Sequence, residues 1–125
     1  MSESLISSIL NDVASHAYAN AKQKGFHDGD PPPEVRGQSV PRVAIFIANL
    51  HGECSKLWEA ARANKLYAAS EKADLDLTNA EEALAGILTR TLDAAYSLNV
   101  DIGAAVVKKM HHDQTRARLH GGKLA

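Results

Sequence analysis

Apolar residues recur every three or four positions along most of this chain, a pattern that predicts amphipathic helices. The first helix is expected over residues 3–24, because Gly25 directly after it favours a helix end. The second is expected over residues 41–63, where Pro41 suits the first turn of a helix. Residues 28–39 between them contain three successive prolines, which cannot donate to a helix or a sheet ladder, and they predict a loop.

Capping residues mark two further helices in the second half of the chain. Thr78 and Glu81 have the spacing of a capping box, so we expect a third helix over residues 78–98. A short turn leads to Asp101, whose carboxylate would cap a fourth helix that fades near Arg116. The four helices predict an all-α antiparallel bundle in which the second and third contribute most of the core.

Two segments lack a clear period. Residues 65–77 are either an extension of the second helix or a charged loop, and residues 117–125 form a basic, glycine-bearing tail that we expect to be irregular. At 125 residues the chain is expected to form one domain, residues 1–125. Helices in so small a bundle leave apolar faces uncovered, so we expect a homodimer or a homotetramer.

Charge and composition argue against several classes of protein. With 14 basic and 15 acidic residues the net charge is -1, so no global field draws the chain to nucleic acid or to an anionic membrane. The longest apolar run, residues 43–48, is far too short to span a bilayer, and the first residues lack the features of a signal peptide. The single cysteine, Cys54, excludes an internal disulfide and fits a reducing compartment. We therefore expect a cytoplasmic protein.

The second helix carries the most informative chemistry. Glu53, Lys56 and Glu59 follow one another at three-residue spacing, which puts the first two on one face of the helix. A Glu-x-x-Glu pair there would bind a divalent cation through hard oxygen ligands. A lysine cannot, because its ammonium group has no lone pair to donate. In the simplest alternative, Lys56 pairs with Glu53 or Glu59 on a partly solvated surface.

Four segments, in this order and spacing, resemble the MazG-like, all-α nucleoside triphosphate pyrophosphohydrolase family: AKQKGFHD, NLHGECSKLWEAAR, EEALAGILTRTLDAAYSLNVDIGAAVVKKM and HHDQTRARLHGGK. The resemblance covers almost the whole chain. It implies a helical bundle that pairs into dimers or dimers of dimers. It also implies hydrolysis of a nucleoside triphosphate to the monophosphate and pyrophosphate, with Mg²⁺ held by Glu-x-x-Glu on one helix and Glu-x-x-Asp on the next.

Carried onto this chain, the family's four carboxylate positions fall on Glu53, Lys56, Ala83 and Gly86. One expected ligand is therefore present and three are replaced. Glu82 is one residue out of register, about 100° around the helix. Lys109 and Arg116 match the phosphate-binding positions that the resemblance implies near the end of the chain.

These replacements leave two hypotheses open. In the first, the protein is a pyrophosphohydrolase with a reduced site, in which Glu53 binds Mg²⁺, Glu59 or Glu82 assists, and Lys109 and Arg116 hold the phosphates. In the second, it is a catalytically silent relative. Lys56 then neutralises phosphate in place of the cation, or the protein simply assembles with itself.

Other residues suggest weaker alternatives. His51 and Cys54 have the spacing to begin a zinc site, but no second Cys/His pair follows nearby. We expect Cys54 and Trp58 to pack in the core and His51 to lie in the interior or at an interface. Trp58 and Phe26 would instead stack on a base if they lay near a nucleotide pocket. Gly86, in the middle of a helix, would permit a close approach between helices.

Overall fold

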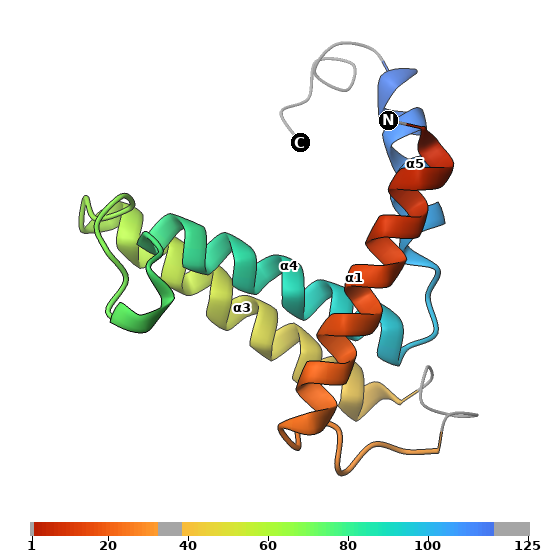
Figure 1. Cartoon of the computed structure of the whole chain (residues 1–125), viewed down its shortest axis with the longest axis horizontal. Coiled ribbons are helices and arrows are strands. Elements are labelled where there is room, and N and C mark those ends of the chain that lie inside the picture. Colours follow the sequence, from red (N-terminus) through yellow and green to blue (C-terminus); the bar gives the residue numbers. More distant parts are fainter. Residues whose placement is uncertain (1, 33–38, 117–125) are drawn as a thin grey trace.

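The computed structural model describes residues 2–32 and 39–116, and it is all-helical as predicted (Figure 1). Its α-helices are α1 (Glu3–Gln23), α3 (Val40–Arg62), α4 (Asn79–Ser97) and α5 (Ile102–Gln114). Within the described ranges there is no strand, and the β-type pairing is an isolated bridge between Ala69 and Thr78. The predicted irregular tail, residues 117–125, lies outside the described residues, as does half of the predicted loop, residues 33–38.

Two helix pairs form two arms of the molecule. Helices α3 and α4 run antiparallel side by side, and α1 packs across the C-terminal part of α4 and alongside α5 (Figure 1). The α3–α4 hairpin and the α1–α5 pair point in different directions from this crossing. None of the described helices is long and apolar enough to cross a membrane.

Both helix starts predicted from capping residues are confirmed. The Thr78 hydroxyl accepts a hydrogen bond from the backbone N–H of Glu81 at 3.1 Å, and the Glu81 carboxylate accepts one from the backbone N–H of Thr78 at 2.9 Å. These reciprocal bonds satisfy two N–H groups that a helix leaves free at its start. Asp101 caps α5 by accepting from the backbone N–H of Ala104 at 3.1 Å.

Residues with a left-handed backbone end three of the helices. Gly25 has φ +87°, and the backbone N–H groups of Gly25 and Phe26 turn back to carbonyls of the last turn of α1, which is the Schellman arrangement. Asn64 and Asn99, with φ 56° and 60°, end α3 and α4 in the same way. Asparagine is one of the few side-chain-bearing residues that tolerates this region.

The segment between α3 and α4 is a folded loop, which resolves the ambiguity over residues 65–77. It contains a short 3₁₀ turn, η1 (Ala73–Leu75). Backbone hydrogen bonds from Ser70 N–H to the carbonyl of Leu77 (2.8 Å) and from Asn79 N–H to that of Ala68 (2.9 Å) fold the loop back onto the start of α4.

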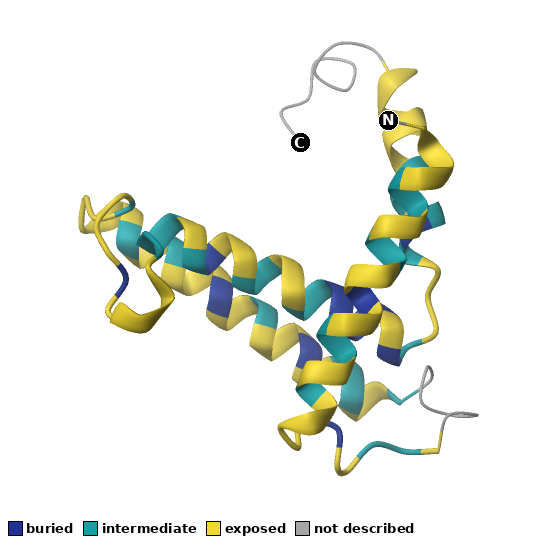
Figure 2. Cartoon of the chain, in the orientation of Figure 1, coloured by how far each residue is buried: buried dark blue, intermediate teal, exposed yellow. Residues whose placement is uncertain are grey.

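The core is small, and α4 supplies most of it. The buried apolar residues among those described are Ala14, Phe46, Ala83, Leu92, Ala94 and Ala95. The expectation that the second and third helices contribute most of the core is confirmed, although α3 contributes only Phe46 to that set. Figure 2 shows the buried positions gathered along the contact between α3 and α4 and at the crossing with α1.

Two predictions of burial on α3 are contradicted in the single chain, because Trp58 is 63% exposed and Cys54 is exposed as well. His51 is also exposed, so of its two predicted places the interior is wrong and an interface stays a prediction. Trp58 and Cys54 have the spacing of residues on one apolar helix face, which predicted burial. Helix α4, however, packs on a different face of α3, where Phe46 and Glu53 are buried. A helix with apolar residues on two faces buries only the face that a neighbour covers.

Candidate functional site

Glu53 is a buried acid in the middle of the α3–α4 hairpin, with 8% of its surface exposed. Its carboxylate lies against Gly86 of α4, so closely that a Cβ atom at position 86 would overlap it. Helix α3 presents Glu53 on the face that packs against α4, about two helical turns from buried Phe46. The missing side chain at position 86 therefore makes room for the acid.

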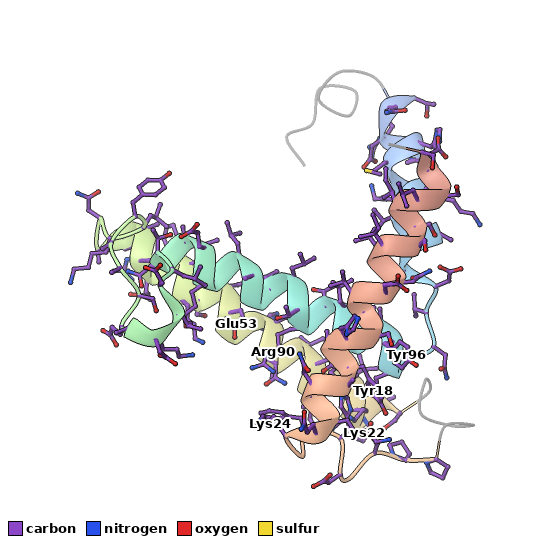
Figure 3. All side chains as sticks on the ribbon, in the orientation of Figure 1. Tyr18, Lys22, Lys24, Glu53, Arg90 and Tyr96 are labelled. Atoms are coloured by element: carbon purple, nitrogen blue, oxygen red, sulfur yellow. The ribbon has the colours of Figure 1, made fainter. Side chains whose placement is uncertain are left out.

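Two cations accompany the Glu53 carboxylate. The Lys56 ammonium lies 3.5 Å from Glu53 Oε1, and the guanidinium Nε of Arg90 lies 3.8 Å from the same oxygen. Figure 3 shows Glu53 on α3 and Arg90 on α4 at neighbouring levels of the hairpin. The simple pairing of Lys56 with Glu53 is thus observed. Its energy is modest, because Lys56 is half exposed and solvent screens the pair.

The arrangement lacks the donor set that a divalent cation needs. The described part of the chain contains no group of three or more His, Cys, Asp or Glu side chains able to hold a metal ion. A cation bound at Glu53 would face the positive charges of Lys56 and Arg90 instead of further carboxylates.

Glu82, proposed as an assisting metal ligand, is engaged elsewhere. Its carboxylate accepts a short hydrogen bond from the Ser70 hydroxyl and lies 3.1 Å from the Lys72 ammonium. The hydrogen bond from Ser70, followed by that from Lys72, lowers the pKa of Glu82 below its ordinary value. Glu82 thus fastens the α3–α4 loop to α4.

An open pocket of about 590 Å³ lies between the C-terminal half of α3, the loop and the start of α4. Its charged and polar lining consists of Lys56, Glu59, Lys65, Ser70, Glu71, Lys72, Asn79 and Glu82. Alanines, among them Ala60, Ala68 and Ala83, supply apolar surface. The pocket therefore combines flat apolar walls with ammonium groups on long, adaptable side chains.

Glu59 lines this pocket but does not join Glu53. It lies 3.3 Å from Arg62, and both side chains are largely exposed. Six positions separate Glu59 from Glu53, which places the two carboxylates about 120° apart around α3. This geometry therefore argues against Glu53 and Glu59 binding the same ion.

Lys109 and Arg116 are not brought to the pocket within one chain. Lys109 lies within α5 and Arg116 just after it, and this helix belongs to the other arm of the molecule, far from the α3–α4 loop (Figure 1). Lys109 pairs with Asp113 at 2.7 Å, and that hydrogen bond lowers the pKa of Asp113. A site that used these residues together with Lys56 would need a second copy of the chain.

A second cleft, between α1 and α4, was not anticipated from the sequence. It measures about 330 Å³ and is lined in part by Lys24, Phe26 and Arg90. The Arg90 guanidinium lies over the Phe26 ring at 5.7 Å from its centroid, and Figure 3 shows Arg90 beside the end of α1 that carries Lys24. Arg90 and Phe26 are 64 residues apart in the sequence, so no local spacing pattern predicts that they pair.

No family model, curated protein or solved structure matched the chain.

Proposed function

We propose that this protein binds a nucleoside triphosphate or a related organic phosphate in the pocket beside Lys56, without the Mg²⁺-dependent hydrolysis of the MazG-like enzymes that its sequence resembles. One observation carries the proposal: the residue beside the buried Glu53 is an ammonium group at the edge of an open pocket, where a cation-binding carboxylate would otherwise stand. Lysine is a frequent phosphate ligand, acting as a point charge.

The size and lining of the pocket suit such a ligand. Sites for small molecules commonly measure about 300–1,000 Å³ and combine apolar walls with a few polar groups, and this pocket measures about 590 Å³. Lys56, Lys65 and Lys72 line the pocket, and phosphate oxygens would compete with Glu53 and Glu82 for the ammonium groups of Lys56 and Lys72. The alanine surface would accept a sugar or a base.

Hydrolysis finds weaker support in the same residues. Phosphoanhydride cleavage depends on metal ions that clamp the phosphate oxygens and neutralise developing charge. Losing about 4 kcal/mol of that stabilisation lowers the rate about a thousandfold. The competing hypothesis keeps Mg²⁺ at Glu53 with help from Glu59 or Glu82, and rests on the retained Glu53 and on the order of the motifs.

Calorimetric titration with nucleoside triphosphates, with and without Mg²⁺, tests the proposal. We expect binding that persists without Mg²⁺ and weakens about tenfold or more in Lys56→Ala. Lys108→Ala, which removes an exposed lysine on the other arm, is the matched control and should bind as the wild type does. Absence of binding overturns the proposal. Pyrophosphate release that Glu53→Gln abolishes would establish the competing enzyme instead.

We also propose that the chain associates with a second copy of itself. Exposed large apolar residues occur on both arms, including Ile9 on α1, Trp58 on α3 and Leu88 on α4. Covering such faces is a common reason for small helical chains to form homodimers.

A further inference from the structure

The cleft between α1 and α4 is lined by two cations that have open hydrogen-bond donors. Lys24 caps the end of α1 and Arg90 lies on α4, and both line this cleft of about 330 Å³. Within residues 2–32 and 39–116, the Lys24 ammonium forms no ion pair or hydrogen bond, and the Arg90 guanidinium donates no hydrogen bond. Both groups carry several N–H donors, so the cleft offers them to a ligand.

Arg90 is held in place by two neighbours that leave these donors open. Its guanidinium carbon lies 5.7 Å from the centroid of the Phe26 ring, and its Nε atom lies 3.8 Å from Glu53 Oε1, beyond hydrogen-bond distance. The planar fork of a guanidinium matches the two oxygens of a carboxylate or a phosphate. Because Arg90 is already oriented, a ligand would bind without the full cost of ordering a long side chain.

The two carboxylates nearest to these cations have partners of their own. Asp93 lines the cleft, and its Oδ1 atom accepts a hydrogen bond from Nε2 of the buried His27 ring at 2.7 Å. Glu53 has the Lys56 ammonium at 3.5 Å in addition to Arg90. An anion that engages Arg90 would therefore leave Glu53 with a cation beside it.

The remaining lining suits the apolar body of a small molecule. Ala17 and Ala21 on α1 supply apolar surface, and the Phe26 ring is 58% exposed. Asn20 and Thr89 add an amide and a hydroxyl group. Small-molecule sites begin at about 300 Å³, so a cleft of about 330 Å³ is large enough for one ring that carries an anionic group.

We propose that this cleft is a second binding site, for a small organic anion with an aromatic body. Lys24 and Arg90 bind its carboxylate or phosphate group, while the Phe26 ring and the alanine walls contact its body. The site is separate from the pocket beside Lys56, because no residue lines both.

An NMR titration of the nitrogen-15-labelled full chain tests the proposal. The probes are benzoate, phenyl phosphate and inorganic phosphate, each compared with sodium chloride at the same ionic strength. We expect saturable shifts of the backbone amide signals of residues 17–26 and 89–93. The two aromatic anions should bind about fivefold or more tightly than inorganic phosphate, because their rings bury apolar surface in the cleft.

Two neighbouring lysines of α1 provide a matched pair of variants. Lys24→Gln should weaken binding of phenyl phosphate about threefold or more, because it removes a charged hydrogen-bond donor. Lys22→Gln should leave it unchanged, since Lys22 does not line the cleft and lies about 200° around the helix from Lys24. Figure 3 shows Lys24 on the same side of the end of α1 as Arg90, with Lys22 on the other.

The proposal is overturned if the shifts at these residues do not exceed those with sodium chloride, or if Lys24→Gln and Lys22→Gln bind alike. Equal affinity for the aromatic anions and inorganic phosphate would overturn the aromatic body of the ligand. Lys24 is exposed, so Lys24→Gln is expected to fold. In Lys56→Ala the shifts at the cleft should persist, so this outcome is distinguishable from a failure of nucleotide binding at Lys56.

Discussion

The carboxylate of Glu53 occupies the space that a Cβ atom at Gly86 would take, so the α3–α4 hairpin packs a buried acid against a residue with no side chain. Any side chain at position 86 must displace the acid, and with it the pairing of that acid with Lys56 and Arg90. The carboxylate is the end of a flexible side chain, so it can move aside. A substitution at position 86 is therefore expected to change which cations the Glu53 carboxylate pairs with.

Carboxylates placed at positions 56, 83 and 86 should create a site for a divalent cation. In Lys56→Glu, Ala83→Glu and Gly86→Asp combined, we expect Mn²⁺ or Mg²⁺ binding by calorimetry where the wild type shows little, because hard cations require several oxygen ligands. The same triple variant with Glu53→Gln should bind the ion more weakly. A folded triple variant, judged by circular dichroism, with no gain in ion binding would contradict the placement of these four positions around one site.

Features that depend on neighbouring residues were predictable from the sequence, whereas the pairing of Glu53 with Arg90 was not. The helical frame and the caps at Thr78 and Asp101 were predictable, because they depend on residues a few positions apart. The partners of Glu53 were not, since Arg90 approaches it from the antiparallel helix. Likewise, no local pattern marks the pairing of His27 with Asp93, which lie 66 residues apart.

Two helical glycines, Gly103 at the contact between α1 and α5 and Gly52 on α3, should respond to substitution by alanine in opposite ways. A Cβ atom at position 103 would overlap the backbone carbonyl of Ser7, which cannot move without shifting α1. We expect Gly103→Ala to lower the free energy of unfolding by about 1–3 kcal/mol. Gly52→Ala should raise it by about 0.5–1 kcal/mol, because a Cβ atom there meets nothing within 4 Å and alanine favours helix.

Urea unfolding followed by circular dichroism measures both glycine variants. Equal effects of the two substitutions would show that helix propensity alone decides them, and that α1 and α5 do not approach as closely as described. The hydrogen bond from the backbone N–H of Gly103 to the Asn11 side chain, at 2.9 Å, offers an independent check. Asn11→Ala should destabilise the same contact.

The capping box predicts a loss of stability in acid. Hydrogen bonds from the backbone and the side chain of Thr78 lower the pKa of Glu81 below its ordinary value of 4.5. The charged carboxylate therefore stabilises the fold above that value, and this contribution disappears as the pH falls through the lowered pKa of the folded state. Glu81→Gln should flatten the stability profile in this acidic range, whereas Glu71→Gln, an exposed change in the neighbouring loop, should leave it unchanged.

The error over Trp58 and Cys54 has a physical cause. Apolar spacing shows that a helix face avoids water, but it does not show which molecule covers that face. On α3 the neighbour within the chain covers the face of Phe46 and Glu53 and leaves Trp58 exposed. An apolar face that stays open in one chain is a reason to look for a second copy.

Trp58 gives a direct measure of that association, because it is the single tryptophan of the chain. At 63% exposure its fluorescence should resemble that of tryptophan in water when the protein is dilute. As the concentration rises and copies associate, we expect the emission to shift to shorter wavelength, with a doubling of mass in light scattering. Glutamate at both Leu84 and Leu88, two exposed apolar residues one turn apart on α4, should prevent the association. Ser15→Glu on α1 adds charge at a polar exposed position and serves as the control. A constant monomer mass at all concentrations would show that these apolar faces remain in water.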